Sequence, residues 1–246
     1  MKLKLAMLAA AATCLCGATA QAATIYSAQG DFSIASNPNG AWAYGTGTAG
    51  SSFAAMPVSG YGVLNANFAY WQVANPVSLV PLIGVNTGSS PDVFGTVLVP
   101  TDVLFMHPGP STDAIVQWTA PSAGTYTISG GFELLDDNPS GVIGEVYDNG
   151  TQLYTGTLTG PAANLGTLTP GGSETFSETV TLAAGDKISF AVNNDGSFYD
   201  DSTGLMATIT AVPEPATWAM MVFGLGGMGA GLRAARRRRS LPAVMA

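Results

Sequence analysis

The chain has 246 residues and a formal net charge of −8, and only 10% of its residues are charged. The segment 23–211 holds fifteen of the sixteen acidic residues but, of the eight basic ones, only Lys187, which gives it a net charge of −14. Such a surface repels phosphate backbones and excludes nucleic acid as a partner. Cys14 and Cys16, the two cysteines, lie outside this segment, which excludes disulfides and thiol chemistry within it.

Residues 1–22 are predicted to be a signal peptide. Lys2 and Lys4 supply a positive start, and an uncharged apolar core covers residues 5–17. Ala20 and Ala22 form an A-x-A cleavage site, so the mature chain is expected to begin at residue 23. The protein is therefore expected to be exported.

The first half of the exported segment carries aromatic side chains with two open interpretations. Trp42, Tyr44 and Trp71 could form a planar platform that stacks on sugars, or they could fill the core of a β-sandwich. The stretch Pro76–Pro110 is rich in proline and glycine, and it is predicted to be an irregular loop that crosses between strands.

His107, the chain's single histidine, lies within this stretch. A Ser-His-Asp hydrolase would need it as a base, oriented by Asp102 or Asp113, and Ser111 is the nearby serine. No G-x-S-x-G motif accompanies it. We therefore expect a structural histidine. With neither cysteine nor a second histidine in the segment, transition-metal chemistry is not expected.

The second half is predicted to contain only strands and turns, because β-branched and aromatic residues alternate with polar ones. The expected strands are Ala114–Thr119, Gly124–Ser129, Val142–Tyr147, Thr175–Leu182, Lys187–Val192 and Leu205–Thr210. Asn149-Gly150 predicts a hairpin turn, since both residues tolerate positive φ. Short strands at this spacing indicate an all-β fold, and residues 23–211 are expected to form a single β-sandwich or jelly-roll ectodomain.

The order of these elements resembles jelly-roll modules of the carbohydrate-binding type. A tryptophan strand leads to A-x-x-G-x-Y, a hairpin with an N-G turn follows, then L-x-x-G-D-x-I-x-F, and an edge strand closes the sheet. The resemblance spans about residues 115–210 and concerns the fold, since this scaffold serves many functions.

Acidic residues in the loops and strands suggest two further kinds of site. Loop carboxylates at Asp195, Asp200 and Asp201 could hold a structural Ca²⁺, which takes oxygen ligands; no cofactor is required. Glu133, near Asp136 and Asp137, and Glu145 are candidates for a glycosidase carboxylate pair. Because acidic residues are scattered along the whole segment, such pairs are also expected by chance, and the protein is expected not to be an enzyme.

The C-terminal region combines a proline box, an apolar run and a basic cluster. The box consists of Pro213, Glu214 and Pro215. Between Glu214 and Arg233 lie eighteen uncharged residues, which as a helix would span about 27 Å, near the ~30 Å hydrocarbon core of a bilayer. Trp218 suits a membrane interface. The run ends in a cluster of arginines that the positive-inside rule places in the cytoplasm: Arg233, Arg236, Arg237, Arg238 and Arg239. One transmembrane helix is therefore predicted, followed by a short cytoplasmic tail at 240–246.

Together, the box, Trp218-Ala219, the glycine-rich run and the arginines resemble a PEP-CTERM sorting signal of the PEP-x-x-W-A form, over residues 212–239. The resemblance implies recognition of Pro213, Glu214, Pro215 and Trp218 by an exosortase, an integral-membrane cysteine protease or transpeptidase. It also implies an exopolysaccharide-producing Gram-negative bacterium.

The function expected from these features is that of a non-enzymatic exported protein, sorted by an exosortase and associated with exopolysaccharide or biofilm. Before processing, the helix would anchor it in the inner membrane with a periplasmic ectodomain, and afterwards it would reach the cell surface or the extracellular matrix. The alternatives are a dedicated carbohydrate-binding module with an aromatic platform, and a secreted glycan hydrolase.

Overall fold

The computed structural model describes residues 23–213 together with Gly226, Met228 and Arg233. Residues Thr24–Ala211 form one compact unit, and every regular element in it is a β-strand. The predicted signal peptide, with Ala20 and Ala22, lies outside the described residues. So does most of the C-terminal segment.

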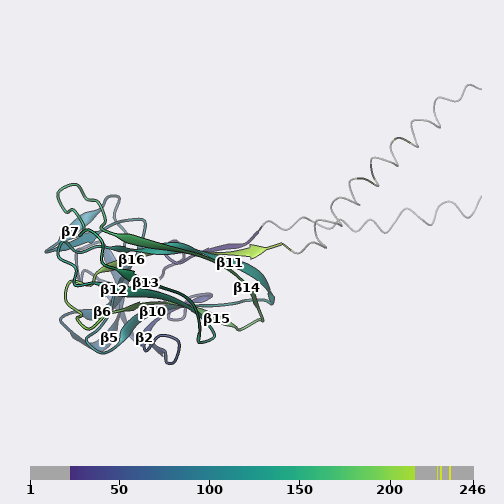
Figure 1. Cartoon of the computed structure of the whole chain (residues 1–246), viewed down its shortest axis with the longest axis horizontal. Helices are drawn as coiled ribbons and strands as arrows, with labels where there is room; N and C mark the ends of the chain where they lie inside the picture. Colours follow the sequence, from purple (N-terminus) through teal and green to yellow (C-terminus); the bar gives the residue numbers. More distant parts are fainter. Residues whose placement is uncertain (1–22, 214–225, 227, 229–232, 234–246) are drawn as a thin grey trace, which may run out of the picture. The chain divides into compact units, whose positions relative to one another are not determined.

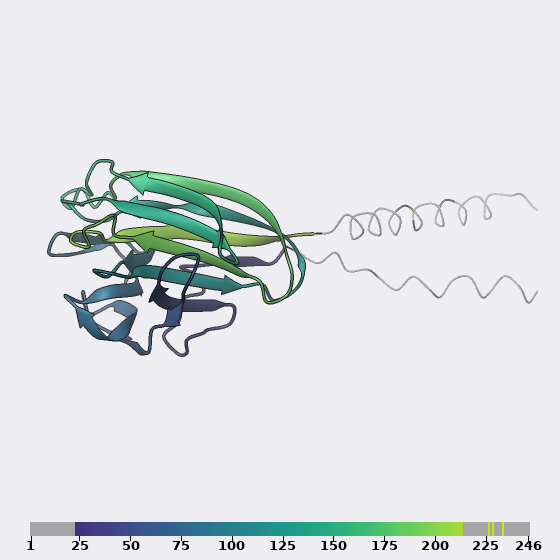
Figure 2. The same ribbon diagram turned by 60° about the horizontal axis from the view of Figure 1, so that its bottom comes forward.

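The first layer is an eight-stranded sheet (Figure 1). Its strands, in spatial order, are β14 (Ser173–Leu182), β11 (Gly124–Leu134), β16 (Thr203–Val212), β9 (Leu104–His107), β6 (Val80–Asn86), β5 (Phe68–Val77) and β4 (Val58–Tyr61), and β1 (Ile25–Ser27) also pairs with β16. Long strands such as β11, β14 and β16 run nearly the full length of the domain (Figure 2).

The second layer is a six-stranded antiparallel sheet. Its strands, in spatial order, are β13 (Thr151–Leu158), β12 (Val142–Asp148), β15 (Lys187–Asn193), β10 (Asp113–Thr119), β2 (Trp42–Gly47) and β3 (Ala54–Ala55). A separate hairpin joins β7 (Asp92–Phe94) to β8 (Val97–Val99). The predicted all-β sandwich is therefore confirmed as two packed sheets.

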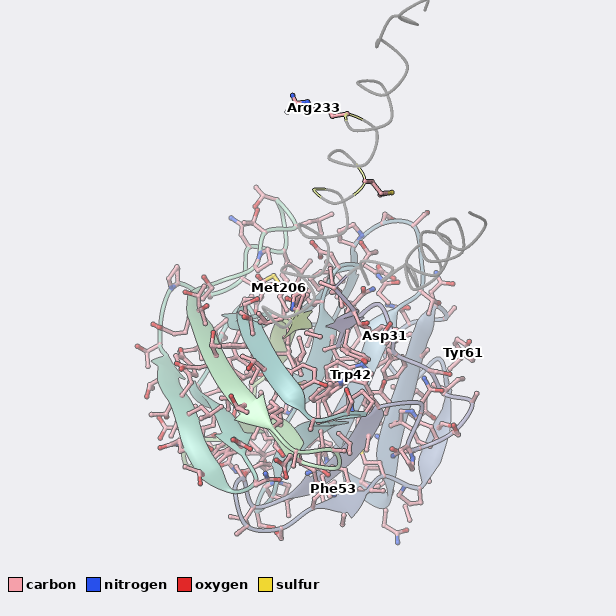
Figure 3. All side chains as sticks on the ribbon, turned by 90° about the vertical axis from the view of Figure 1, so that its right-hand side faces the viewer. Asp31, Trp42, Phe53, Tyr61, Met206 and Arg233 are labelled. Atoms are coloured by element: carbon pink, nitrogen blue, oxygen red, sulfur yellow. The ribbon has the colours of Figure 1, made fainter. Side chains whose placement is uncertain are left out.

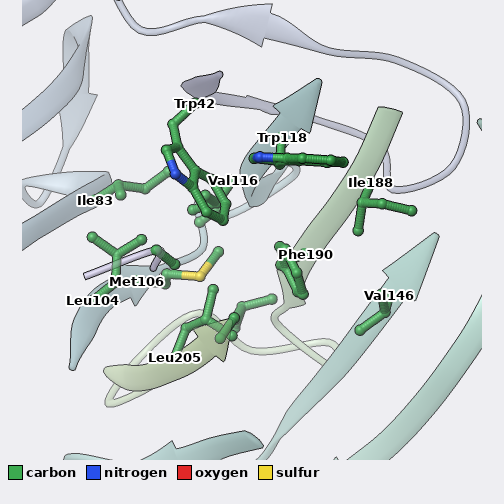
Figure 4. Close-up of a cluster of buried hydrophobic side chains, with 14 of the residues drawn as sticks. Trp42, Ile83, Leu104, Met106, Val116, Trp118, Val146, Ile188, Phe190 and Leu205 are labelled. Atoms are coloured by element: carbon green, nitrogen blue, oxygen red, sulfur yellow. The ribbon is translucent and has the colours of Figure 1, made fainter. Parts of the chain in front are cut away.

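Alternating side chains of both sheets form the main core between the layers (Figure 4). On β10, Val116 and Trp118 are buried against residues of the opposite sheet such as Leu205 and Met106. Aromatic rings dominate this core. Trp118, for example, meets the ring of Tyr126 edge-on at a centroid distance of 5.1 Å, a geometry that aromatic pairs favour.

The hairpin predicted at Asn149-Gly150 is confirmed. Asn149 has φ 46° and Gly150 has φ 89°, and the flanking strands β12 and β13 pair antiparallel. Both residues adopt the left-handed conformation that a two-residue hairpin turn requires and that asparagine and glycine tolerate.

The loop predicted over Pro76–Pro110 is wrong, because this stretch contributes β6, β7, β8 and β9. All residues of β6 are buried, since a second apolar cluster lies on the other face of this part of the sheet. That cluster comprises Leu64, Phe68, Val80, Leu82, Val99, Val103, Phe105 and Leu135. A strand buried on both faces shows no alternation of polar and apolar residues. The prolines and glycines of the stretch were therefore the strongest signal, and they predicted a loop.

The last strand also differs from the prediction. We expected Leu205–Thr210 to close a sheet as an edge strand, but β16 lies inside the sheet between β11 on one side and β9 and β1 on the other. The second side is shared by β9 and β1, which are short and far from β16 in the sequence. Thr203–Leu205 pairs with β9, and Thr208–Thr210 pairs with β1. Sequence order gave no sign of these two partners.

Candidate functional site

The proline box follows directly on the central strand β16. This strand ends at Val212, and Pro213 is the last residue described before the apolar run. Glu214, Pro215, Trp218 and Arg236–Arg239 lie outside the described residues, whereas Arg233 has helical backbone and is exposed. Among the residues that the structure describes, none belongs to a helix long and apolar enough to cross a bilayer.

The first and the last residues of the described domain are neighbours in the fold. In the pairing of β1 with β16, Ile25 lies opposite Thr210. Beyond the strand pair, the backbone N–H of Ala211 donates to the carbonyl of Thr24 at 3.0 Å. Hydrogen bonds thus hold β16 as far as Ala211. Val212 comes next, and the proline box begins directly after it.

The aromatic platform predicted at Trp42, Tyr44 and Trp71 is wrong, because the three side chains lie in the core with exposed fractions of 1%, 0% and 6%. The indole N–H of Trp42 donates to Asp31 Oδ2 at 3.2 Å, and that of Trp71 donates to the carbonyl of Ser33 at 2.8 Å. Figure 3 shows Trp42 in the interior, whereas Tyr61 lies at the periphery. The alternative interpretation, that these rings fill the sandwich, holds.

His107 is held in a structural environment at the end of β9. Its Nδ1 lies 2.9 Å from the carbonyl of Pro108, and burial lowers its pKa. The carboxylate of Asp113 accepts hydrogen bonds from the Ala49 N–H at 2.7 Å and from Asn193 Nδ2 at 2.8 Å. The geometry therefore gives no sign of Asp113 orienting His107 as a triad would require.

The two strand glutamates come from different sheets. Glu133 on β11 and Glu145 on β12 each alternate with buried residues of their strand, so their side chains point away from the shared core, toward opposite faces. The two carboxylates therefore do not face each other across a cleft, as paired glycosidase carboxylates do.

Each glutamate has a raised pKa. Burial raises the pKa of Glu133 to about 7, with a further contribution from Asp102. Burial also raises the pKa of Glu145, although hydrogen bonds to its Oε1 from the Tyr147 hydroxyl and Gln152 Nε2, both at 2.9 Å, oppose the shift. Burial is the largest cause of each shift, and a neighbouring carboxylate adds to it, Asp102 for Glu133 and Asp113 for Glu145.

The loop carboxylates are partly buried and mutually repulsive. Asp201 is fully buried; its Oδ1 accepts a hydrogen bond from Ser140 Oγ at 2.6 Å, while Oδ2 has no partner in the described part of the chain. Burial raises the pKa of Asp201 to about 7, and Asp136, Asp200 and Asp195 add to the rise. Between residues 23 and 213, no three carboxylate or histidine side chains are gathered in a way that would hold a metal ion. The expected Ca²⁺ ligands Asp195, Asp200 and Asp201 are thus not assembled.

Sequence reasoning missed a segment that crosses the outer face of the six-stranded sheet. Residues 48–53, the crossing segment, connect β2 to β3. These six residues include three small polar ones, Thr48, Ser51 and Ser52, and one phenylalanine, and they give no periodic signal. The usable signal is on β2 itself, where Ala43, Gly45 and Gly47 alternate with larger residues and leave one face of the strand without bulk.

Comparison with known proteins identifies the C-terminal segment and describes the rest only by fold. The profile of the PEP-CTERM protein-sorting motif matches residues 211–239, so the chain carries this motif at its C-terminus. No curated protein matches the sequence.

Solved structures similar to parts of the chain have low sequence identity and TM-scores of 0.30 or less. A family 35 carbohydrate-binding module from an environmental isolate is 18% identical, with 61% of this chain and 93% of that one covered and a TM-score of 0.30. A family 35 module from Clostridium thermocellum is 11% identical, over 43% of this chain and 76% of that one, with a TM-score of 0.27. Latent PorU from Porphyromonas gingivalis is 10% identical with a TM-score of 0.30; the match covers 40% of this chain but only 10% of PorU.

Proposed function

We propose that the protein is a non-enzymatic component of the cell surface or extracellular matrix, delivered by an exosortase that processes it at its C-terminal motif. The observation that carries the proposal is the position of the motif: its match begins at residue 211, where the central strand β16 ends. The folded sandwich is the cargo, and the motif follows it without an intervening linker.

The absence of an enzymatic role is supported by how the candidate catalytic groups are used. His107 and Asp113 are engaged with nearby backbone and side-chain groups, and Glu133 and Glu145 point to opposite faces of the sandwich. His107 and Asp113 thus have structural partners, and the two glutamates do not form a facing pair. We therefore assign no reaction to the domain.

The charge of the domain fits a location among extracellular polymers. With a net charge of −14 over residues 23–211, the domain resists self-association and repels nucleic acid. Before processing, the apolar run and its arginines would hold the chain in the inner membrane with the domain in the periplasm. Afterwards the domain would reside at the surface or in an exopolysaccharide matrix.

The test is intact mass spectrometry of the protein isolated from its own host and from a strain lacking the exosortase. We expect a mature C-terminus close to Pro213 in the host and a retained tail in the mutant strain. Glu214→Ala should block processing, and Glu174→Ala, an exposed residue of β14, serves as the matched control. A tail retained in both strains, with the chain in the membrane fraction, would contradict the proposal.

A further inference from the structure

The crossing segment forms a roof over the outer face of the six-stranded sheet. The N–H of Ala49 donates to Asp113 Oδ2 at 2.7 Å. Gly50 lies so close to the ring of Tyr147 that a Cβ there would be 2.6 Å from Cε1. The ring of Phe53 covers Gly45, where a Cβ would lie 2.5 Å from its Cε2. Figure 3 shows Phe53 near the margin of the domain.

The small residues of β2 let the roof lie close to the sheet. Trp42 and Tyr44 are buried in the core, so the alternating Ala43 and Gly45 face outward. The register places Gln117 of β10 opposite Ala43 and Ile115 opposite Gly45. Gly45 leaves room for the ring of Phe53, and the open space lies beside this ring, over Ile115 and Gln117 of β10 and Ser189 of β15.

The result is a cavity of about 310 Å³, within the range of ~300–1,000 Å³ found for small-molecule sites. Its walls combine apolar and hydrogen-bonding groups, namely Ser51, Ser52, Phe53, Ile115, Gln117 and Ser189. Gln117 is only 9% exposed, and its Nε2 donates to Ser189 Oγ at 3.1 Å. A side-chain amide can form up to four hydrogen bonds, so this buried amide retains capacity toward a ligand.

Lys187 completes the cavity at its mouth, beside Asn149 and Gly150. It is the only basic residue of the segment 23–211. Its backbone is fixed by two contacts with Asn149: the Lys187 N–H donates to Asn149 Oδ1 at 2.9 Å, and its carbonyl accepts from the Asn149 N–H at 2.9 Å. The hairpin turn therefore positions the base of the domain's one ammonium group at this opening.

We propose that this cavity binds one uncharged pyranose ring. A pyranose has an apolar C–H face suited to Phe53 and Ile115, and hydroxyl groups that pair with amides, serine hydroxyls and an ammonium. A small ring also suits the modest volume. This site is separate from the buried aromatic residues and from the loop carboxylates.

The ligand is uncharged because the surroundings of the cavity are acidic despite Lys187. Asp186 is adjacent to Lys187 in sequence, and Asp113 anchors the roof. The whole domain has a net charge of −14, so the electrostatic field at its surface is negative. A sugar acid would meet this field, whereas a neutral sugar would not.

The inference goes beyond the proposed function, and neither depends on the other. It is tested by titrating the full chain, in a zwitterionic detergent without a sugar headgroup, with the methyl α- and β-glycosides of glucose, galactose and mannose. Calorimetry should give a Kd on the order of 1 mM for at least one of them. Glucuronate and inorganic phosphate are titrated in parallel.

Two variants locate the binding. Ser189→Phe fills the floor of the cavity, and Lys187→Met removes the ammonium while keeping most of the side-chain length. Each should weaken binding at least about tenfold, or ~1.4 kcal/mol. Thr179→Phe, on exposed β14 of the other sheet, is the matched control and should bind as the parent does. Thermal melting of each variant verifies folding, and Lys187→Met keeps the test decisive if Ser189→Phe is unstable.

Three outcomes would overturn the inference. These are no binding of any of the six glycosides, binding that is unchanged in both cavity variants, and tighter binding of glucuronate or phosphate than of every neutral glycoside. Processing by the exosortase enters none of these measurements, so its failure would leave this result intact.

Discussion

Glu133 should make the domain less stable as the pH rises through neutrality. Its carboxylate lies on the outer side of β11 close to Gly204, where a Cβ would be 3.2 Å from Oε1. Partial burial and the neighbouring Asp102 raise its pKa from 4.5 to about 7. At neutral or alkaline pH, the folded chain must therefore either keep a proton on Glu133 or hold an ionised Glu133 carboxylate that is partly buried and close to Asp102.

The sign of the effect follows from proton binding in the two states. Between pH 4.5 and about 7 the unfolded chain releases a proton that the folded chain keeps, so the free energy of unfolding falls as the pH rises. Below pH 4.5 both states are protonated and the effect vanishes. Above about pH 7 the penalty is complete.

The structure sets the size of this penalty. The interval from 4.5 to about 7 corresponds to ~3.4 kcal/mol at 1.36 kcal/mol per pH unit. Because Glu133 keeps contact with solvent, screening reduces the figure by about half, to ~1–2 kcal/mol. Glu133→Gln should therefore raise the stability at pH 8 by ~1–2 kcal/mol, at about 2–4 °C in Tm per kcal/mol for a domain of this size.

The assay is urea or thermal unfolding of the parent and of Glu133→Gln between pH 4 and pH 8.5. We expect equal stability near pH 4 and a difference that grows through pH 7. Glu174→Gln, at an exposed position of β14, controls for the general effect of removing one negative charge. A difference that is constant with pH, or a less stable Glu133→Gln protein at pH 8, would refute the reasoning.

Two further predictions concern the core and the roof. Trp118→Ala should lower the free energy of unfolding by ~3–5 kcal/mol. The indole is fully buried, and its ring centroid lies 5.1 Å from those of Tyr26 and Tyr126. A loss below ~1 kcal/mol in urea titration would contradict this. Asp113→Ala removes the acceptor for the Ala49 N–H, so limited proteolysis should cut the crossing segment faster than in the parent while the sandwich remains resistant; an unchanged cleavage pattern would show that the roof is held by other contacts.

The second half of the fold could be predicted from sequence, because its strands have one buried and one exposed face. On β11, for example, Tyr126, Ile128 and Phe132 are buried and alternate with polar residues or glycine, so the period of two was visible. On β6, burial of both faces removed that alternation. The difference lies in what covers the strand, and that depends on segments distant in sequence.

The candidate sites also differ in whether local sequence is enough to predict them. The sorting motif was predictable because its residues act in sequence order, independently of the fold. The fate of Trp42 was not, since a tryptophan on a strand has the same local pattern whether it faces the core or a ligand. The sequence around Glu133 and Glu145 likewise does not show to which sheet each residue belongs. Only the pairing of the strands places the two carboxylates on opposite faces of the sandwich.

The placement of β16 determines how the domain carries mechanical load. A pull applied through Val212 enters a strand with neighbours on both sides, β11 along one and β1 and β9 along the other. Force directed along the strand acts in shear, so hydrogen bonds on both flanks resist it together. A tether on an edge strand could peel that strand away one bond at a time. A pull on the C-terminus would therefore have to break the hydrogen bonds of both flanks together before β16 could leave the sheet.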